Sequence, residues 1–348
     1  MGGDAQVPGV QTGTRLAFFG SMTLLAREMR AVLEKRPFLV TDVRLYDAAG
    51  EGALSEYAGE ALVVSRPDED AILGLDIAFY CGTTAEMAPY LDWPARRGFT
   101  AIDLSGASLD RPDVPLIHTD INAADLGRAG AAVPLVAAPH AISHNIATLA
   151  AASAEAGALK AIRAVALRPA SEMGEAGIEE LQRQTVGLLN FHEVPHDVFG
   201  RQMAFNIIPS RGMAAIEAVV LEPRIRREAA LLSRLDVASV SLATAFVPVF
   251  HGHALHLTLE FEQAVTMAAL ESSLRQARGV RLVEDPAEFS PVDLAGEESV
   301  AVSAMPIDGG ASRVVMLWSF CDNLRGGAAL NAIRIAERVA DLRQGMGR

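Results

Sequence analysis

Hydrophobic and polar residues follow two different patterns along the chain. In the N-terminal third, short continuous apolar runs alternate with stretches of helical spacing, of which Leu24–Leu33 is the first. Continuous apolar runs are typical of strands that are buried on both faces, as in a parallel sheet covered by helices. We therefore predict a doubly wound α/β domain whose strands lie at 15–20, 43–46, 61–64, 77–80, 101–104 and 133–137.

The second half of the chain has a period of two instead. Leu255, Leu257 and Leu259 alternate with polar residues, which indicates a strand with one solvated face. Companion strands are expected at 299–304 and 314–320, with helices at 178–189 and 328–342. This pattern predicts an α+β domain with an antiparallel or mixed sheet, whose other face could cover a partner subunit.

Composition excludes several classes of protein. The chain has 348 residues, 50% of them hydrophobic, and a formal net charge of −13 without a basic cluster. These values argue against disorder and against a nucleic-acid or anionic-membrane partner. The two cysteines are too few for a disulfide framework. The first fourteen residues do not resemble a targeting segment, and no apolar run is long enough to span a bilayer. We expect a cytoplasmic protein.

A turn after the first strand is placed where a dinucleotide would bind. Gly20 ends the strand, and a helix follows within four residues. Backbone amides at such a helix start favour a pyrophosphate, but close approach requires several glycines. Thr23 and Ala26 occupy the two other glycine positions. A strand-to-helix turn that only preserves the fold therefore remains the stronger interpretation.

Histidines mark two further places. His140 and His144 have the i, i+4 spacing of a helical metal pair, but a helix N-terminus disfavours a cation and a third ligand is not evident, so we assign no metal site. Ser143 could be a nucleophile beside His144, although capping of the following helix is the commoner role of serine at such a position. His251 and His253 flank a turn at Gly252, and either could be a general base, although a lone histidine at such a place is more often structural.

Taken together, several motifs resemble those of the aspartate-semialdehyde dehydrogenase family, over about 15–340, with the Usg-type subgroup most similar. The motifs occur in the family's order and spacing, and this makes them specific as a set. They are Ile102-Asp-Leu-Ser, Pro112-Asp-Val-Pro-Leu, Gly177-Ile-Glu-Glu-Leu, Gly200-Arg-Gln-Met-Ala-Phe-Asn-Ile-Ile-Pro, Val247-Pro-Val-Phe-His-Gly-His and Asp322-Asn-Leu-Arg-Gly-Gly-Ala-Ala-Leu-Asn.

The resemblance implies a two-domain homodimer. A Rossmann-like dinucleotide-binding domain would comprise 14–142 with 323–348, and an inserted dimerisation domain would comprise 143–322. The family's enzymes reduce aspartyl phosphate to the semialdehyde with NADPH, through a thioester on a cysteine and with a histidine that moves protons. Arginine and glutamine side chains hold the substrate's carboxylate and phosphate.

Much of that chemistry is missing from this sequence. The position of the family's nucleophilic cysteine is Ala141, which cannot form a thioester. Alignment with the family places neither Cys81 nor Cys321 in that role. The family's histidine is retained as His253. Further substitutions and retentions implied by the resemblance are Arg168 for the glutamine, Phe246 for the carboxylate-binding arginine, Leu109 for a phosphate-binding arginine, and a retained Arg224.

The resemblance also gives candidate cofactor positions, but it assures no cofactor. The loop after the second strand, starting at Asp47, is acidic and would repel a 2′-phosphate, so NAD fits better than NADP if either binds. The positions that would contact a dinucleotide are Gly20, Thr23, Gly82, Asn323 and Gly327.

Two functions remain open. The first is a catalytically degenerate homodimer that acts as a scaffold, or that binds a protein partner or a small anion through Arg168 and Arg224. The second is an enzyme, either an NAD(P)-dependent aldehyde oxidoreductase or one with changed hydrolytic or metal-assisted chemistry at Ser143, His140, His144 and His253. Because the nucleophile and the substrate clamp are missing, we favour the first.

Overall fold

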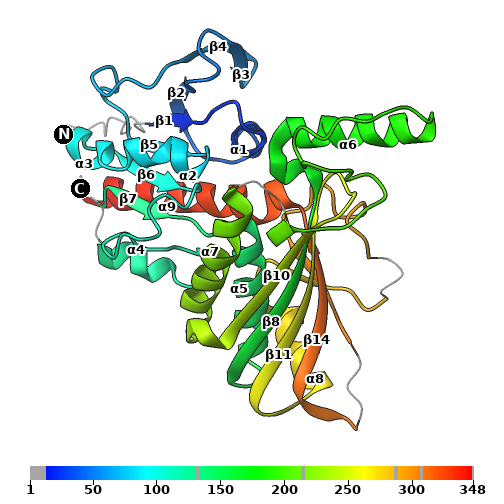
Figure 1. Ribbon diagram of the computed structural model, residues 1–348. Coiled ribbons are helices and arrows are strands. Elements are labelled where there is room, and N and C mark those ends of the chain that lie inside the picture. The colour runs from blue at the N-terminus through cyan, green and yellow to red at the C-terminus, as the bar shows by residue number, and fades with distance from the viewer. Residues whose placement is uncertain (1–12, 130–132, 213–215, 286–288, 306–308, 347–348) are drawn as a thin grey trace, which may run out of the picture.

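Two seven-stranded sheets organise the chain (Figure 1). The computed structural model describes residues 13–129, 133–212, 216–285, 289–305 and 309–346, so the first twelve residues lie outside it. In the first sheet the order is β3-β4-β2-β1-β5-β6-β7, and every pairing is parallel except β3 with β4. Its strands are β1 (Thr14–Phe19), β2 (Val40–Tyr46), β3 (Leu54–Tyr57), β4 (Glu60–Ser65), β5 (Ile77–Tyr80), β6 (Thr100–Asp103) and β7 (Leu135–Ala137).

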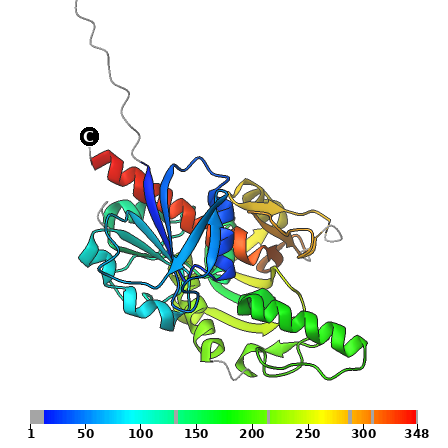
Figure 2. The ribbon, with the colours of Figure 1, turned by 90° about the horizontal axis from the view of Figure 1, so that it is seen from above.

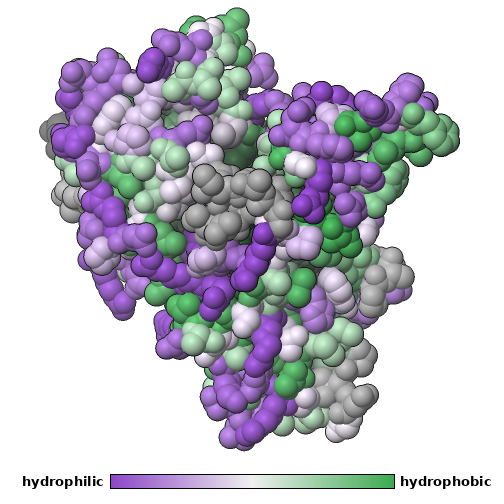
Figure 3. All heavy atoms as spheres, viewed as in Figure 1, coloured by the Kyte–Doolittle hydropathy of each residue, from purple (hydrophilic) through white to green (hydrophobic). Residues whose placement is uncertain are grey.

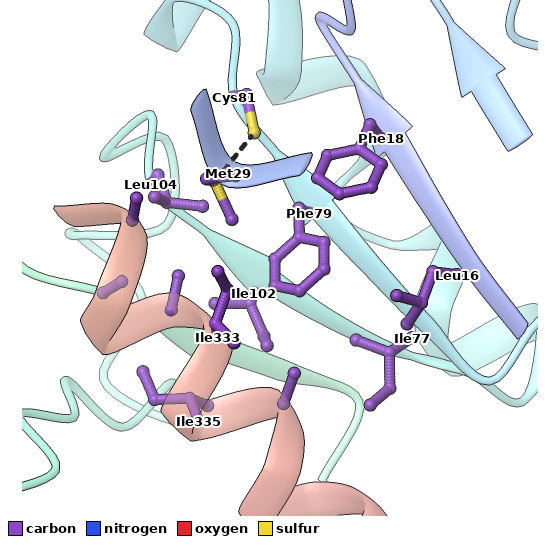
Figure 4. Close-up of a cluster of buried hydrophobic side chains, with 14 of the residues drawn as sticks. Leu16, Phe18, Met29, Ile77, Phe79, Cys81, Ile102, Leu104, Ile333 and Ile335 are labelled. Atoms are coloured by element: carbon purple, nitrogen blue, oxygen red, sulfur yellow. Dashed lines mark hydrogen bonds between the residues drawn. The ribbon is translucent and has the colours of Figure 1, made fainter. Parts of the chain in front are cut away.

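Helices from both ends of the chain complete this domain. In Figure 2 the C-terminal helix α9 lies along the N-terminal sheet. The apolar core joins strand residues such as Phe18 and Phe79 to Ile333 and Ile335 of α9 (Figure 4). The helices are α1 (Leu24–Leu33), α2 (Thr84–Met87), α3 (Trp93–Arg97), α4 (Ala123–Ala129), the π-helix η6 (Asn323–Ala329) and α9 (Leu330–Met346).

The second sheet is mixed and has the order β12-β13-β14-β11-β8-β10-β9. Strands β8 and β10 are parallel, as are β12 and β13, and the remaining pairings are antiparallel. The strands are β8 (Leu159–Arg168), β9 (Ile208–Pro209), β10 (Val240–Phe246), β11 (His253–Thr266), β12 (Val280–Leu282), β13 (Val300–Ala304) and β14 (Ala311–Cys321).

One face of this sheet is covered by helices and the other is open. Apolar residues of α5 (Ala141–Ala154), α7 (Ile216–Ser233) and α8 (Met267–Gln276) pack into a core with β8, β11 and β14. The opposite face presents Val165, Met316 and Trp318, all of them exposed. Helix α6 (Gly174–Leu189) projects from the body, and its far end is apolar (Figures 1 and 3). Phe191, just beyond that end, is 97% exposed.

The predicted fold class is confirmed: a Rossmann-like α/β domain is joined to a second domain with a mixed sheet. Helix α1 and strand β5 have the predicted bounds. Strand β3 was not predicted, since its residues are short of apolar character and it pairs only at the edge of the sheet. Within the described residues, every helix is too short or too polar to cross a membrane.

Candidate functional site

Helix α5 begins where the two sheets meet, and Ala141 is its first residue. The side chain is buried against the backbone of the π-helix: a Cβ atom added to Gly327 would lie 3.1 Å from the Cβ of Ala141. The retained Gly327 therefore makes room for residue 141. Because residue 141 ends in a methyl group, this position has no nucleophile.

A buried carboxylate organises the start of α5. Glu228 Oε2 of α7 accepts a hydrogen bond from the His140 amide (2.8 Å) and another from the Ser143 hydroxyl (2.6 Å). The cap of the helix is the His140 side chain, whose Nδ1 accepts from the Ile142 amide. The predicted capping role of Ser143 was therefore wrong, because Glu228 takes its hydroxyl. The same contact directs that hydroxyl away from the role of a nucleophile beside His144.

Four ionisable side chains meet above Ala141. Glu172 lies in the short helix η2 (Ala170–Met173), and its carboxylate hydrogen-bonds to Arg168 Nε and to His253 Nε2. His140 Nε2 lies 3.8 Å from the same carboxylate. The Arg168 guanidinium also donates to Ser210 and stacks on the ring of Phe246, 4.1 Å from its centroid.

The electrostatics of this cluster depend on Glu172. Burial raises the pKa of Glu172, but the attraction of Arg168 and His253 lowers it by more. The pKa therefore lies well below its ordinary value, and the carboxylate stays ionised. Burial lowers the pKa of His253, yet attraction to Glu172 and contact with Cys321 raise it to about 9. Burial lowers the pKa of His140 to about 3, with only partial compensation by Glu172. At neutral pH the cluster therefore has one charged and one neutral histidine.

Arg224, the second candidate arginine, is also paired inside the protein. Its Nε donates to Glu228 Oε1 (2.7 Å), and its two terminal nitrogens donate to the carbonyl oxygens of Ser105 and Leu104. Both Arg168 and Arg224 lie close enough to His140 to lower its pKa. Each guanidinium already has a carboxylate partner from this chain, Glu172 for Arg168 and Glu228 for Arg224.

His140 and His144 do not form a pair. The ring of His140 approaches His253, with 6.2 Å between centroids, whereas the ring of His144 stacks on His118 at 4.1 Å. Of the three histidines considered for changed chemistry in the cleft, His140 and His253 lie close together, whereas His144 stacks on His118 instead. Among the described residues, no group of three or more histidine, cysteine, aspartate or glutamate side chains is arranged to hold a metal ion.

Asn323, one of the predicted dinucleotide contacts, links the π-helix η6 to the cluster of Glu172 and His253. Its Oδ1 accepts from the Gly252 amide (2.8 Å) and its Nδ2 donates to the Ser171 hydroxyl (3.1 Å). Gly252 has φ of +90°, which favours glycine at this turn before His253. Asn323 thus fixes both the start of β11 and the turn that holds Glu172, one residue from Ser171.

The first loop is closed by contacts within the chain. Gly20 has φ of +69°, and a Cβ atom there would lie 2.6 Å from the amide nitrogen of Gly82. Thr23 caps α1 by accepting from the Ala26 amide (3.2 Å). Asp47 follows β2 and accepts from the Met22 amide (3.2 Å), one of the loop donors that would face a pyrophosphate.

Glu172 and Glu228 were not among the site residues predicted from the sequence. Each follows its arginine by four residues, at 168/172 and 224/228. At 224/228 both residues lie in α7, where this spacing is a usable signal for a pair, whereas Arg168 ends β8 and Glu172 lies in η2. His118 was not predicted as a site residue either, and Cys321 was given no role.

The dimerisation part of the chain matches a known family. Residues 149–326, half of the chain, match the model described as semialdehyde dehydrogenase, dimerisation domain. Aspartate-semialdehyde dehydrogenase of Mycolicibacterium smegmatis is 31% identical over 90% of this chain and 94% of its own. The enzyme of Rickettsia bellii (strain RML369-C) is 28% identical over 93% of this chain and 97% of its own.

Solved structures agree with this match. A probable aspartate-semialdehyde dehydrogenase from Pseudomonas aeruginosa superposes with a TM-score of 0.85 and 26% identity, over 94% of this chain and 99% of the other. Aspartate semialdehyde dehydrogenase II from Vibrio cholerae, complexed with ASA, gives a TM-score of 0.84 and 25% identity, over 95% of this chain and 99% of its own.

Proposed function

The chain belongs to the semialdehyde dehydrogenase family, and from this premise we propose that it is a homodimeric, Usg-type binding protein of the cytoplasm without the family's cysteine-dependent reaction. The observation that carries the proposal is Ala141. This residue occupies the start of α5, buried against Gly327, and has only a methyl group. Removal of a nucleophile typically costs several orders of magnitude in rate.

The state of the two arginines supports the proposal. A substrate with a carboxylate and a phosphate needs unpaired cationic groups, but Glu172 and Glu228 already neutralise Arg168 and Arg224. Phe246 stacks under the Arg168 guanidinium where the resemblance would place a substrate-binding arginine. A ligand of this cleft must therefore bind without two free arginines, or displace a buried carboxylate.

Contacts of the loop after β1, where a dinucleotide would bind, also support the loss of the family's reaction. Asp47 takes the Met22 amide, and Arg27 of α1 pairs with Glu175 of α6 across the two domains (2.7 Å). Arg27 also donates to the Met22 carbonyl oxygen. We propose no resident cofactor. An acidic residue directly after the second strand favours the ribose hydroxyls of NAD over the 2′-phosphate of NADP.

The open face of the second sheet is the proposed contact with a second copy of the chain. Val165, His256 and Trp318 lie in one row across β8, β11 and β14. Glu260, paired with Lys160 and Arg163, lies nearby on the same strands. An apolar centre with a charged rim is typical of protein interfaces, and this part of the chain matches a dimerisation domain.

A direct assay tests the loss of activity. Purified protein is incubated with aspartate semialdehyde, phosphate and NADP, and then with NAD in its place, while absorbance at 340 nm is recorded. We expect no rate above a control without protein, and a trace rate from a contaminant would persist in His253→Ala. Ordinary turnover that disappears in His253→Ala would overturn the proposal and restore the oxidoreductase alternative.

A further inference from the structure

Cys321 and His253 face each other on neighbouring strands. Cys321 is the last residue of β14, His253 is the first of β11, and the antiparallel register places them directly opposite. Directly opposed residues project from the same face of a sheet, with Cβ atoms about 5 Å apart. Here that face packs against α5, because Cys321 belongs to the same core as Ile142 and Ile146. The thiol therefore lies beneath the site at the start of α5.

The sulfur atom has polar neighbours. Asn145 of α5 donates to Cys321 Sγ (3.3 Å), and its own Oδ1 accepts from the Ser319 hydroxyl (2.9 Å). Contact with this thiol is also one of the causes that raise the pKa of His253. Cys321 is thus held between an amide donor and an imidazole.

His253 has one nitrogen to spare for the thiol. Its Nε2 is bonded to Glu172, whereas its Nδ1 is buried and has no hydrogen-bond partner in the described part of the chain. An unpartnered polar atom on a side chain that is 1% exposed is costly unless it serves an interaction. Thiol, imidazole and carboxylate thus follow one another as the nucleophile, the group that transfers protons and the carboxylate that orients this group.

The Cys321 thiol lies about one turn of α5 away from Ala141, the position of the family's nucleophile. Asn145, which contacts the sulfur, is four residues after Ala141 on α5. Residues four apart share a helix face and are separated by about 6 Å along the axis. Cys321 of the sheet therefore lies against the same face of α5 that begins with Ala141.

We propose that Cys321 is the nucleophile of this cleft and that it holds small aldehydes as reversible covalent adducts. The sulfur forms a bond to the carbonyl carbon and the carbonyl π bond breaks. His253 is protonated at neutral pH, so its Nδ1 proton passes to the carbonyl oxygen while the thiol proton replaces it on Nδ1, which gives a hemithioacetal and leaves the imidazolium unchanged. No oxidant or leaving group is required, and reversal of the same steps releases the aldehyde.

The environment of this thiol limits its ligands. Cys321 is 1% exposed, whereas the His140 side chain of the same cluster is 20% exposed, and we therefore restrict the proposed ligands to small aldehydes. Cys81 provides an internal contrast. Its sulfur contacts Met29 in the apolar core (Figure 4), and burial raises its pKa to about 12. Both cysteines are thus buried, but the sulfur of Cys321 has polar neighbours and that of Cys81 lies in the apolar core.

The inference rests on the proposed function in that the cleft binds a ligand, and it names the class of that ligand. The test is alkylation of the native full-length chain with iodoacetamide at pH 7.5, read by peptide mass spectrometry. We expect modification at Cys321 and not at Cys81, with competition by glycolaldehyde. His253→Gln should slow the reaction at Cys321 about 100-fold, while Cys81→Ser should leave it unchanged.

Other results overturn the assignment. Equal rates at both cysteines, labelling only after unfolding, or the absence of protection by glycolaldehyde would each exclude Cys321 as the nucleophile. The aldehyde oxidation assay, repeated with Cys321→Ser, separates this failure from that of the proposed function. Turnover lost in Cys321→Ser would overturn the inactive role and retain the nucleophile, whereas absent turnover with absent labelling would overturn only the nucleophile.

Discussion

The rings of His118 and His144 lie face to face, with 4.1 Å between centroids and 9° between planes. His118 belongs to the segment before α4, and its Nε2 is 3.0 Å from the Thr148 hydroxyl of α5. Its Nδ1 accepts from the Asp120 amide. The stack therefore joins the first domain to the helix that begins at the site.

This stack predicts acid instability. Burial lowers the pKa of His118 to about 4, with Asp120 opposing and Arg334 adding to the shift, and lowers that of His144 well below its usual value. The folded histidines stay neutral while the unfolded ones protonate near pH 6.5, so stability falls as pH drops from about 6.5 towards 4. For His118 alone the loss is about 3 kcal/mol.

Urea unfolding at pH 7 and pH 5 measures this loss. His118→Gln retains a polar partner for Thr148 and removes one of the two titrations, so its free energy of unfolding should depend less on pH. An unchanged pH dependence would place the acid-sensitive group elsewhere.

Neutralising Glu172 should affect both its partners. In Glu172→Gln the pKa of His253 should fall from about 9 towards or below its ordinary value, because the attracting charge is removed while the burial remains. Arg168 becomes a buried charge without a carboxylate partner, at a cost of about 3 kcal/mol. In the wild-type protein the ion pair between Glu172 and His253 contributes its full stabilisation below about pH 6.5. This contribution is lost as pH rises through about 9, where His253 loses its proton.

Histidine NMR titration and thermal unfolding check the Glu172 prediction. Glu69→Gln is the matched control, because it removes an Arg96 partner at the surface, where solvent screens the pair and its loss should change stability little. Similar losses in the two variants would contradict the assigned role of the buried pair.

Replacing Ala141 by cysteine should not create a dehydrogenase. The thiol would be packed against Gly327, Arg168 would still be occupied by Glu172, and Phe246 would still fill the position of the substrate clamp. NADPH formation in Ala141→Cys should equal that in Ala141→Ser, which has similar volume and a weaker nucleophile. A rate specific to the cysteine variant would show that the cleft has kept the remaining machinery.

A charge on the open sheet face should separate the dimer. Val165 is 44% exposed in the single chain and shares a row with His256 and Trp318. Val165→Asp would bury a carboxylate without a partner at the contact, so sedimentation should detect a monomer at micromolar concentration. Leu54→Asp, an exposed apolar residue of β3 in the other sheet, should remain dimeric. Two dimeric variants would exclude this face.

The close approach of Gly20 and Gly82 gives a stability test. In Gly20→Ala the left-handed backbone conformation lowers the free energy of unfolding by about 1–2 kcal/mol. The new Cβ atom would also lie 2.6 Å from the Gly82 amide nitrogen. Gly59→Ala is the control, because Gly59 has φ of +79° and open space around its Cβ position. Urea unfolding should show a clearly larger loss for Gly20→Ala, and equal losses would mean that the two loops separate easily.

Local pattern explains why much of the fold could be predicted. Helix α1 combines strict amphipathic spacing with a threonine cap, and β5 is four buried residues in a row. Helix α7 was not predicted, because it contains Pro223 and lacks a clear apolar stripe. Tertiary packing against α5 and the second sheet, rather than local preference, stabilises it.

The candidate site was less accessible from sequence. His253 and Ala141 were identified through family motifs, and both lie at the cluster. The relation between Cys321 and His253 depends on strand register between residues 68 positions apart, which no local pattern specifies. The role of Ser143 was decided by Glu228, a residue 85 positions away. Long-range contacts, not local propensity, determine which side chains contact one another in this cleft.

Helix α9 imposes an order on biosynthesis. Ile333, Ile335 and Val339 belong to the core of the first sheet, yet the ribosome makes them after the whole second sheet. The nascent first sheet thus stays without one wall while the second domain already has all the strands it needs. A chaperone that shields apolar surface would accordingly meet Phe18 and Phe79 during synthesis, and truncation before α9 should release aggregates rather than an intact Rossmann-like half.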